Sequence, residues 1–205
     1  LMDELIHVIS NFLPNANSKN IEIISVNSGL INSTYKVEFK KSAFILQKVN
    51  QFVFKDPNLI QENYNQIVKH LSVSGYSKKQ LEFLKSNSNL ELVHYNNTFW
   101  RMSKFILGKT YTVCKSSEMA STAAKSLAEF HVSLKELDYK KIKEPIKDFC
   151  NFNYRIQQYR ESIIHGDSHR LKNTRDFMGE IESNLKYIHE YMKIEKEIKK
   201  ANFIS

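Results

Sequence analysis

Cysteine, proline and glycine are scarce in this chain, whose 205 residues include two, three and five of them, respectively. The two cysteines, Cys114 and Cys150, have neither metal-ligand spacing nor a disulfide-rich setting, so reduced, packed thiols are expected. No run approaches the roughly 18 apolar residues of a membrane helix, and the N-terminal segment lacks the basic flank and apolar core of a signal peptide. These absences predict a globular cytoplasmic protein that binds no membrane.

Charge of one sign is not concentrated anywhere, although the formal net charge is +8 at pH 7. A positive balance could attract nucleic acid, a membrane surface or an anionic nucleotide. The lysines are scattered, however, and most lie near Glu or Asp in the chain. No interleaving of aromatic and basic residues marks a nucleic-acid-binding surface, so no nucleic-acid partner is expected.

The first hundred residues show the patterns of a small sheet preceded by a helix. Apolar residues at helical spacing predict a helix over residues 2–13, which Pro14 ends. β-branched residues and period-two alternation predict strands over residues 21–26, 33–39 and 43–49. The short turn at Lys40-Lys41-Ser42 joins the second and third strands as in a meander.

A helix and a hairpin follow these strands. Asp56 is a plausible N-cap with Pro57 at the first helical position, and apolar residues then recur at helical intervals. Residues 91–95 and 98–106 are expected to form two strands around Asn96-Asn97, a dipeptide that tolerates left-handed backbone conformations. The resulting order, β-β-β-α-β-β, is that of a kinase-like N-terminal lobe.

Helical patterns dominate after Gly108. Ser116 or Ser117 can cap a helix with an alanine-rich apolar face that reaches Leu134, and further helices are expected over residues 155–164 and 174–200. The fold class expected is therefore α+β and protein-kinase-like. Its N-lobe, residues 1–106, has an antiparallel five-stranded sheet with one helix, and residues 107–205 begin a helical C-lobe.

The stretch from Asn27 to Asn50, NSGLINSTYKVEFKKSAFILQKVN, carries the most functional information. Gly29 lies between the first two expected strands, and a residue without Cβ lets a loop backbone approach a phosphate and direct N–H groups at it. A single glycine is also compatible with an ordinary hairpin. The chemistry of the residues alone leaves both interpretations open.

Three blocks of the sequence are similar to the N-acetylhexosamine 1-kinases, a sugar-kinase branch of the aminoglycoside-phosphotransferase, protein-kinase-like superfamily. They are residues 29–37, residues 44–54 with the strand FILQKVN, and residues 100–106 with the text WRMSKFI. The resemblance extends from about Met2 to the C-terminus. It implies an enzyme that uses ATP and Mg²⁺ to phosphorylate the anomeric hydroxyl of an N-acetylhexosamine.

The same resemblance implies that the chain ends before the catalytic loop. Members of the family are longer, and their general base and metal ligands are expected beyond Ser205, so no catalytic or metal residue is assigned in this chain. The 205 residues alone are expected to be inactive. The substrate could instead be another small hydroxylated molecule such as an aminoglycoside, choline or homoserine, or the protein could be a non-catalytic binder of nucleotide or of a partner.

Candidate nucleotide-binding residues follow from the kinase-like order. The loop residues Ser28, Gly29 and Asn32 are candidates for contacting phosphates, and Gln47 stands where related kinases carry a phosphate-binding lysine. Phe105 and Leu107 belong to the exit of the last strand, the hinge whose backbone would bond the adenine. The alternative for this exit is a plain edge strand. An apolar nucleotide slot is expected from Ile23, Val37, Ile45 and Leu107.

His165-Gly166-Asp167 has the composition of a kinase catalytic loop but not its spacing. Such a loop places a magnesium-binding Asn five positions after the Asp, whereas Lys172 occupies that position and Asn173 lies one step too far. The residues that follow are helical in pattern, so the catalytic interpretation is rejected. In the sugar kinases, Asp167 and Arg170 match a segment that precedes the true catalytic loop.

Arg155 matches an arginine on the substrate side of the sugar kinases, where it follows a Phe-His-Asp-like element. This chain has Phe149-Cys150-Asn151 at that element, so the histidine is absent. Arg155 is a candidate sugar contact. The alternative is a structural ion-pair residue.

Overall fold

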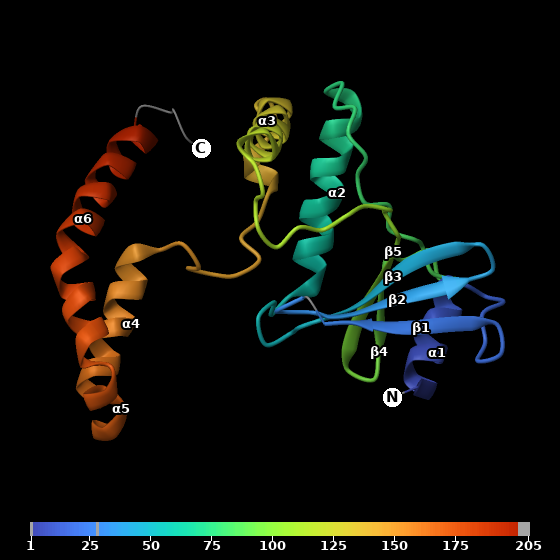
Figure 1. The fold of residues 1–205 in the computed structure, drawn as a ribbon, viewed down its shortest axis with the longest axis horizontal. Helices are drawn as coiled ribbons and strands as arrows, with labels where there is room; N and C mark the ends of the chain where they lie inside the picture. Colours follow the sequence, from blue (N-terminus) through green and yellow to red (C-terminus); the bar gives the residue numbers. More distant parts are fainter. Residues whose placement is uncertain (1, 28, 201–205) are drawn as a thin grey trace. The chain divides into compact units, whose positions relative to one another are not determined.

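The computed structural model of the protein describes residues 2–27 and 29–200, with the helical backbone only at 199 and 200 (Figure 1). The chain divides into two compact units, Leu1–Ile146 and Lys147–Ser205. No helix within the described residues has the length and apolar character needed to cross a membrane.

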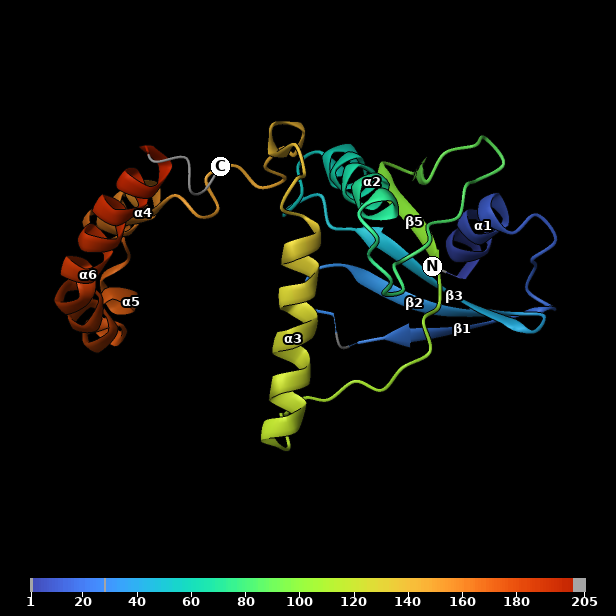
Figure 2. The same ribbon diagram turned by 90° about the horizontal axis from the view of Figure 1, so that it is seen from above.

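A five-stranded antiparallel sheet forms the centre of the first unit (Figures 1 and 2). The strand order is β1-β2-β3-β5-β4. The strands are β1 (Ile21–Val26), β2 (Ser33–Phe39), β3 (Ser42–Val49), β4 (Leu92–Tyr95) and β5 (Thr98–Lys104). The predicted α+β class with an antiparallel five-stranded sheet is confirmed, and β5 lies between β3 and β4 rather than at an edge.

Two tight turns set the register of the sheet. Lys40, between β2 and β3, has a φ of 54°, and Asn96 and Asn97, between β4 and β5, have φ values of 46° and 57°. Asn tolerates this left-handed region better than most residues because its short polar side chain bonds the local backbone. The hairpin predicted at Asn96-Asn97 is therefore present with the backbone conformation that its sequence favours.

Helix α1 (Met2–Phe12) covers one face of the sheet and forms the main core with it. Side chains from alternate strand positions point toward α1, among them Leu46, Trp100 and Met102, none of which is exposed. The full core cluster is Leu5, Val8, Ile9, Phe12, Ala16, Val37, Phe39, Leu46, Trp100 and Met102. Because side chains alternate along a strand, this packing also decides which residues face away from α1.

Helix α2 (Pro57–Val73) begins as predicted, with the Asp56 carboxylate accepting a hydrogen bond from the Asn58 amide at 3.0 Å. It lies on the side of the sheet opposite α1 (Figure 1). Its Tyr64 ring packs edge-on against Phe83 at 4.8 Å. Phe83 belongs to a short segment that pairs with β5 through an isolated bridge to Ser103.

Helix α3 (Ser117–Ser133) is capped by the Ser116 hydroxyl, which accepts from the Met119 amide at 3.1 Å. It buries none of its residues and meets the end of α2 through polar and ring contacts. Phe130 packs against Tyr76 at 5.9 Å, and Glu129 pairs with Lys78 at 3.3 Å. The apolar face predicted here is thus largely solvent-exposed. A short 3-10 helix, η1 (Tyr139–Lys141), follows.

The second unit consists of helices α4 (Phe152–His165), α5 (Ser168–Asn173) and α6 (Arg175–Lys200). Phe152 and Tyr191 stack edge-on at 5.3 Å, and the Tyr159 hydroxyl donates to the Met178 carbonyl at 3.3 Å. Burial and the neighbouring Glu182 raise the pKa of the Tyr159 hydroxyl, so it remains a neutral donor near pH 7.

We predict that the 205-residue chain self-associates and binds apolar dyes. Several large apolar side chains are more than half exposed, including Leu127 at 57%, Val132 at 73%, Phe177 at 64% and Ile194 at 53%. Patches of this kind favour association. Size-exclusion chromatography and dye fluorescence measure it. Replacing Phe177 and Ile194 with Gln should reduce both signals without lowering the melting temperature, and a compact monomer with little dye binding would contradict the prediction.

Candidate functional site

The candidate site lies on the face of the sheet that points away from α1, which we call the open face. Gln47 alternates with the buried Leu46 on β3, and Arg101 lies between the buried Trp100 and Met102 on β5. Gln47 and Arg101 are register partners, as are Thr34 and Gln47. All three side chains therefore share the open face, and each is partly exposed.

A continuous polar row crosses this face from the glycine loop to β5. The Thr34 hydroxyl donates to the backbone carbonyl of Asn32 in the glycine loop at 3.5 Å, and it lies 3.8 Å from the position that a Cβ added at Gly29 would take. The Gln47 amide Nε2 donates to that hydroxyl at 3.5 Å, and the Gln47 Oε1 accepts from the Arg101 Nε at 3.1 Å. The structure thus brings the predicted residues Gly29 and Gln47, and Thr34 between them, to the same face as Arg101. The sequence analysis did not identify Arg101.

Arg101 is held by two contacts. Besides its bond to Gln47, its guanidinium carbon lies 4.8 Å from the centre of the Phe83 ring, the same ring that packs against Tyr64. Burial lowers the pKa of the guanidinium below its ordinary value, and the Tyr64 hydroxyl opposes this shift. An arginine stays protonated in proteins, so this group is a permanent cation at the sheet surface.

The glycine loop is tied to the end of β3. The Asn32 Oδ1 accepts from the Asn50 amide at 3.0 Å, and the Asn50 side chain donates to the Ile31 carbonyl at 3.1 Å. The side-chain oxygen of Asn32, a predicted phosphate contact, is thus engaged in holding the loop against the end of β3. Ser28 lies outside the described residues.

Gly29 has room for a side chain. The nearest atom to an added Cβ is the Asn32 carbonyl oxygen at 3.5 Å, which is an ordinary contact, and the φ of Gly29 is not in the left-handed region. Neither crowding nor backbone strain within the described chain therefore requires glycine here. A requirement for glycine at this position would have to come from something that approaches the loop.

The strand exit after β5 keeps free backbone groups. The Phe105 amide donates to the Ala43 carbonyl at 3.0 Å, which extends the β3–β5 pairing. Among the described residues, nothing hydrogen-bonds to the backbone of Ile106 or Leu107, and Leu107 is 89% exposed. Donors and acceptors are therefore available at the position predicted as a hinge.

The predicted apolar slot is corrected by the register. Val37 is fully buried in the α1 core, and Ile23 packs against the same core, so both face away from Ile45. Alternation along β1 and β2 is the cause, because the prediction combined positions of opposite parity. Ile45 does lie on the open face, beside Ser103 and Lys36 in the register.

Two charged residues near the polar row in the sequence or on α2, Lys48 and Glu62, lie away from it in the structure. Lys48 points to the α1 side, where its ammonium lies 3.5 Å from the Glu4 carboxylate and 5.2 Å from the Trp100 ring centre. Glu62 on α2 pairs with Lys143 at 3.2 Å in an exposed ion pair. Neither side chain forms an ion pair or hydrogen bond with Arg101 among the described residues.

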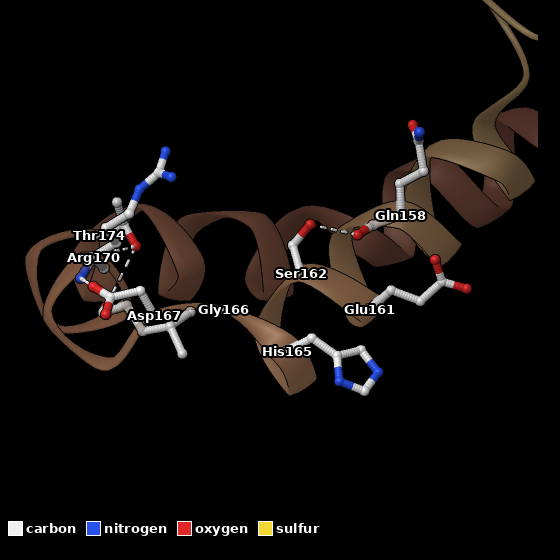
Figure 3. A pocket seen from close by; sticks show the side chains of 9 residues that line it. Gln158, Glu161, Ser162, His165, Gly166, Asp167, Arg170 and Thr174 are labelled. Atoms are coloured by element: carbon white, nitrogen blue, oxygen red, sulfur yellow. Dashed lines mark hydrogen bonds between the residues drawn. The ribbon is translucent and has the colours of Figure 1, made fainter.

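The second unit contains a pocket of about 600 Å³ around the His-Gly-Asp motif (Figure 3). The Asp167 carboxylate caps α5 by accepting from the Arg170 amide at 3.0 Å, and Figure 3 shows the His165 ring directed away from it. A Cβ on Gly166 would lie 2.4 Å from the Ser162 carbonyl oxygen, so the glycine allows a close approach of backbone. The motif thus has a structural explanation in a helix corner.

Arg155 is exposed on α4 and takes part in no ion pair among the described residues. Its Nε donates to the Phe149 carbonyl at 3.3 Å, and its Nη1 donates to Gln158 at 2.8 Å. The bond to Phe149 therefore stabilises the turn before α4. Its role toward a sugar stays a prediction.

The residues that the structure describes form no cluster of three or more His, Cys, Asp or Glu side chains able to hold a metal ion.

Comparison with known proteins supports the fold. No protein-family model matches the sequence. The chain has the protein-kinase-like fold of the aminoglycoside phosphotransferases. A solved structure with this fold, spectinomycin phosphotransferase APH(9)-Ia in complex with ADP and spectinomycin, aligns with 97% of the chain at a TM-score of 0.55 and 14% sequence identity. The alignment spans 58% of that protein's chain.

We predict that Asp167→Asn, in the protein at its full natural length, leaves stability nearly unchanged and phosphotransfer within severalfold of the unmodified protein. Asn caps a helix about as well as Asp, so the bond to the Arg170 amide is kept, whereas Asp167→Ala should cost about 1 kcal/mol. Thermal melts and steady-state rates measure the two effects. A folded Asp167→Asn protein with a rate reduced about 10³-fold would identify Asp167 as the general base after all.

Proposed function

We propose that the protein is an ATP-dependent phosphotransferase that acts on a hydroxyl group of a small molecule. The observation that carries the proposal is the polar row on the open face, which joins the glycine loop to a fixed cation within a kinase-like sheet. The free backbone at Ile106 and Leu107 supports an adenine contact beside it. In this proposal, residues 1–106 form the nucleotide-binding lobe and the helical lobe begins at residue 107.

The chain's own groups have defined roles in the proposal. The loop around Gly29 positions the terminal phosphates through backbone N–H groups, and the polar row neutralises part of their charge. Phosphoryl transfer depends mainly on such positioning and electrostatic stabilisation rather than on covalent catalysis by the protein. Mg²⁺ belongs to the proposal as a cofactor, and its ligands are not assigned among the described residues.

The acceptor proposed is the anomeric hydroxyl of an N-acetylhexosamine, on the basis of the three sequence blocks that resemble the N-acetylhexosamine 1-kinases. A second candidate acceptor is an aminoglycoside, which is favoured by the structural similarity to a spectinomycin phosphotransferase. Arg155 remains the proposed sugar contact, because its guanidinium is exposed and one of its terminal nitrogens has no partner among the described residues.

An acceptor panel tests this function. The protein at its full natural length is incubated with ATP, Mg²⁺ and one acceptor at a time, and phosphorus NMR identifies the product. The panel comprises N-acetylglucosamine, N-acetylgalactosamine, spectinomycin, choline and homoserine. We expect a sugar 1-phosphate. Product with spectinomycin alone would assign the second candidate, and ATP binding without transfer to any acceptor would indicate a non-catalytic nucleotide binder.

We predict that Gly29→Val raises the KM for ATP and lowers kcat while leaving the KM for the acceptor nearly unchanged. The added side chain crowds the phosphates that are proposed to lie against the loop. The melting temperature should change little, because an added Cβ meets only ordinary contacts in this loop.

The matched control for this variant is Gly29→Ala, which adds the Cβ alone. It should give a smaller effect in the same direction on ATP kinetics. Melting temperature and kinetics are measured on the same preparation of each variant. A lowered melting temperature with unchanged ATP kinetics would mean that the loop is an ordinary hairpin outside the nucleotide site.

A further inference from the structure

Arg101 is a cation without an anionic partner on a sheet whose other long-chain cations are all paired. Within the described strands, Lys36 pairs with Glu38, Lys48 with Glu4 and Lys104 with Glu82. None of the ion pairs in the described part of the chain includes Arg101. Leaving a partly desolvated charge unpaired is unfavourable, so this exception calls for a physical reason.

The surroundings of Arg101 fix its orientation without neutralising it. The Gln47 Oε1, a neutral acceptor, accepts a hydrogen bond from the Arg101 Nε at 3.1 Å. The guanidinium carbon packs against the Phe83 ring at 4.8 Å from its centre. The terminal Nη1 and Nη2 groups donate no hydrogen bond within the described residues. A held guanidinium with a free fork of N–H donors has the geometry that binds two oxygens of one phosphate or carboxylate.

The position of Arg101 suits the phosphates of a nucleotide. Ala43 and Phe105 are paired next to the free hinge backbone, and this pair lies on the same face of the sheet as the pair formed by Gln47 and Arg101. Ala43 and Gln47 are four positions apart on β3, which corresponds to about 13 Å at the rise of an antiparallel strand. This separation is comparable with the length of an extended nucleotide. The polar row also reaches the loop that contains Gly29, the proposed phosphate loop, through the bond from Thr34 to Asn32.

We propose that Arg101 binds the nucleotide phosphates in place of the lysine that kinases carry on the third strand, and that Gln47 is a positioning residue that holds the guanidinium. The inference rests on the proposed nucleotide-binding function. In this proposal the phosphate-binding cation stands on β5, at the register partner of Gln47, and not on β3. The amide at Gln47 then has a definite role, since a carboxylate there would neutralise the cation before any phosphate arrived.

The competing explanation is that Arg101 only packs α2 against the sheet through Phe83 and Tyr64. The two explanations predict different measurements. A packing role makes Arg101→Gln less stable without changing nucleotide preference, whereas a phosphate-binding role weakens ATP more than adenosine. The comparison of ATP with adenosine isolates the phosphate contribution, because both share the base and the ribose.

The test measures dissociation constants of ATP and adenosine by isothermal titration calorimetry, with melting temperatures on the same samples. For Arg101→Gln we expect a Kd for ATP raised roughly tenfold or more, as for loss of a hydrogen bond to a charged group, and an unchanged Kd for adenosine. The matched control is Lys48→Gln, which removes one positive charge from the other face of the sheet and should leave both constants unchanged.

A second variant, Gln47→Glu, leaves Arg101 in place and keeps the size of the side chain. The new carboxylate should pair with Arg101, so we expect an equal or higher melting temperature together with weaker ATP binding and unchanged adenosine binding. This variant keeps the test available if Arg101→Gln fails to fold. Weaker ATP binding without loss of stability would place the phosphates beside Gln47 and Arg101, because the new carboxylate neutralises the cation and repels the phosphates.

Other outcomes overturn the proposal. A folded Arg101→Gln protein, or the Gln47→Glu protein, that binds ATP as tightly as the unmodified protein would remove Arg101 from the phosphate site while leaving nucleotide binding intact. An equal loss for ATP and adenosine would assign Arg101 to packing. If the unmodified protein binds neither ATP nor adenosine, the proposed function fails and this inference fails with it, a result distinct from the others.

Discussion

Burial of alternate side chains of β3 and β5 beneath α1 is the constraint on which the rest of the structure depends. Leu46, Trp100 and Met102 are completely buried there, and their removal from water supplies a large share of the stability of the first unit. A shift of either strand by one residue would expose this core, so the register is strongly specified. The same register leaves Gln47 and Arg101 as neighbours on the opposite face. The candidate site is therefore a consequence of the core, although it shares no residue with it.

Local features of the fold could be predicted from the sequence because each is decided by nearby residues. The Asp56 cap, the Asn96-Asn97 turn and the strands over Ile21–Val26 and Ser33–Phe39 are examples. Arg101 could not be found in this way, since its relation to Gln47 depends on pairing between segments 54 residues apart in the chain. The expected apolar slot was wrong for a related reason: Val37 and Ile45 were grouped without regard to strand parity.

The His165-Gly166-Asp167 motif shows why composition without spacing is weak support for catalysis. Each residue has a local explanation in the corner between α4 and α5: Gly166 avoids a clash with the Ser162 carbonyl, Asp167 caps a helix and His165 ends one. The spacing to Asn173, six positions after Asp167 rather than five, already argues against a catalytic loop.

The pairing of Gln47 with Arg101 also suggests how a kinase-like sheet can lack a lysine on its third strand. A lysine on that strand is usually matched by a carboxylate on the helix that packs nearby, which orients it. Here the corresponding helix offers Glu62 to Lys143 at the surface instead, and Arg101 is oriented by an amide and an aromatic ring. Such an arrangement needs no carboxylate to hold the cation in position, so its full positive charge stays available to an incoming anion. Under the role proposed for Arg101, a guanidinium held by neutral groups makes both a lysine on the third strand and a helix carboxylate near the polar row unnecessary.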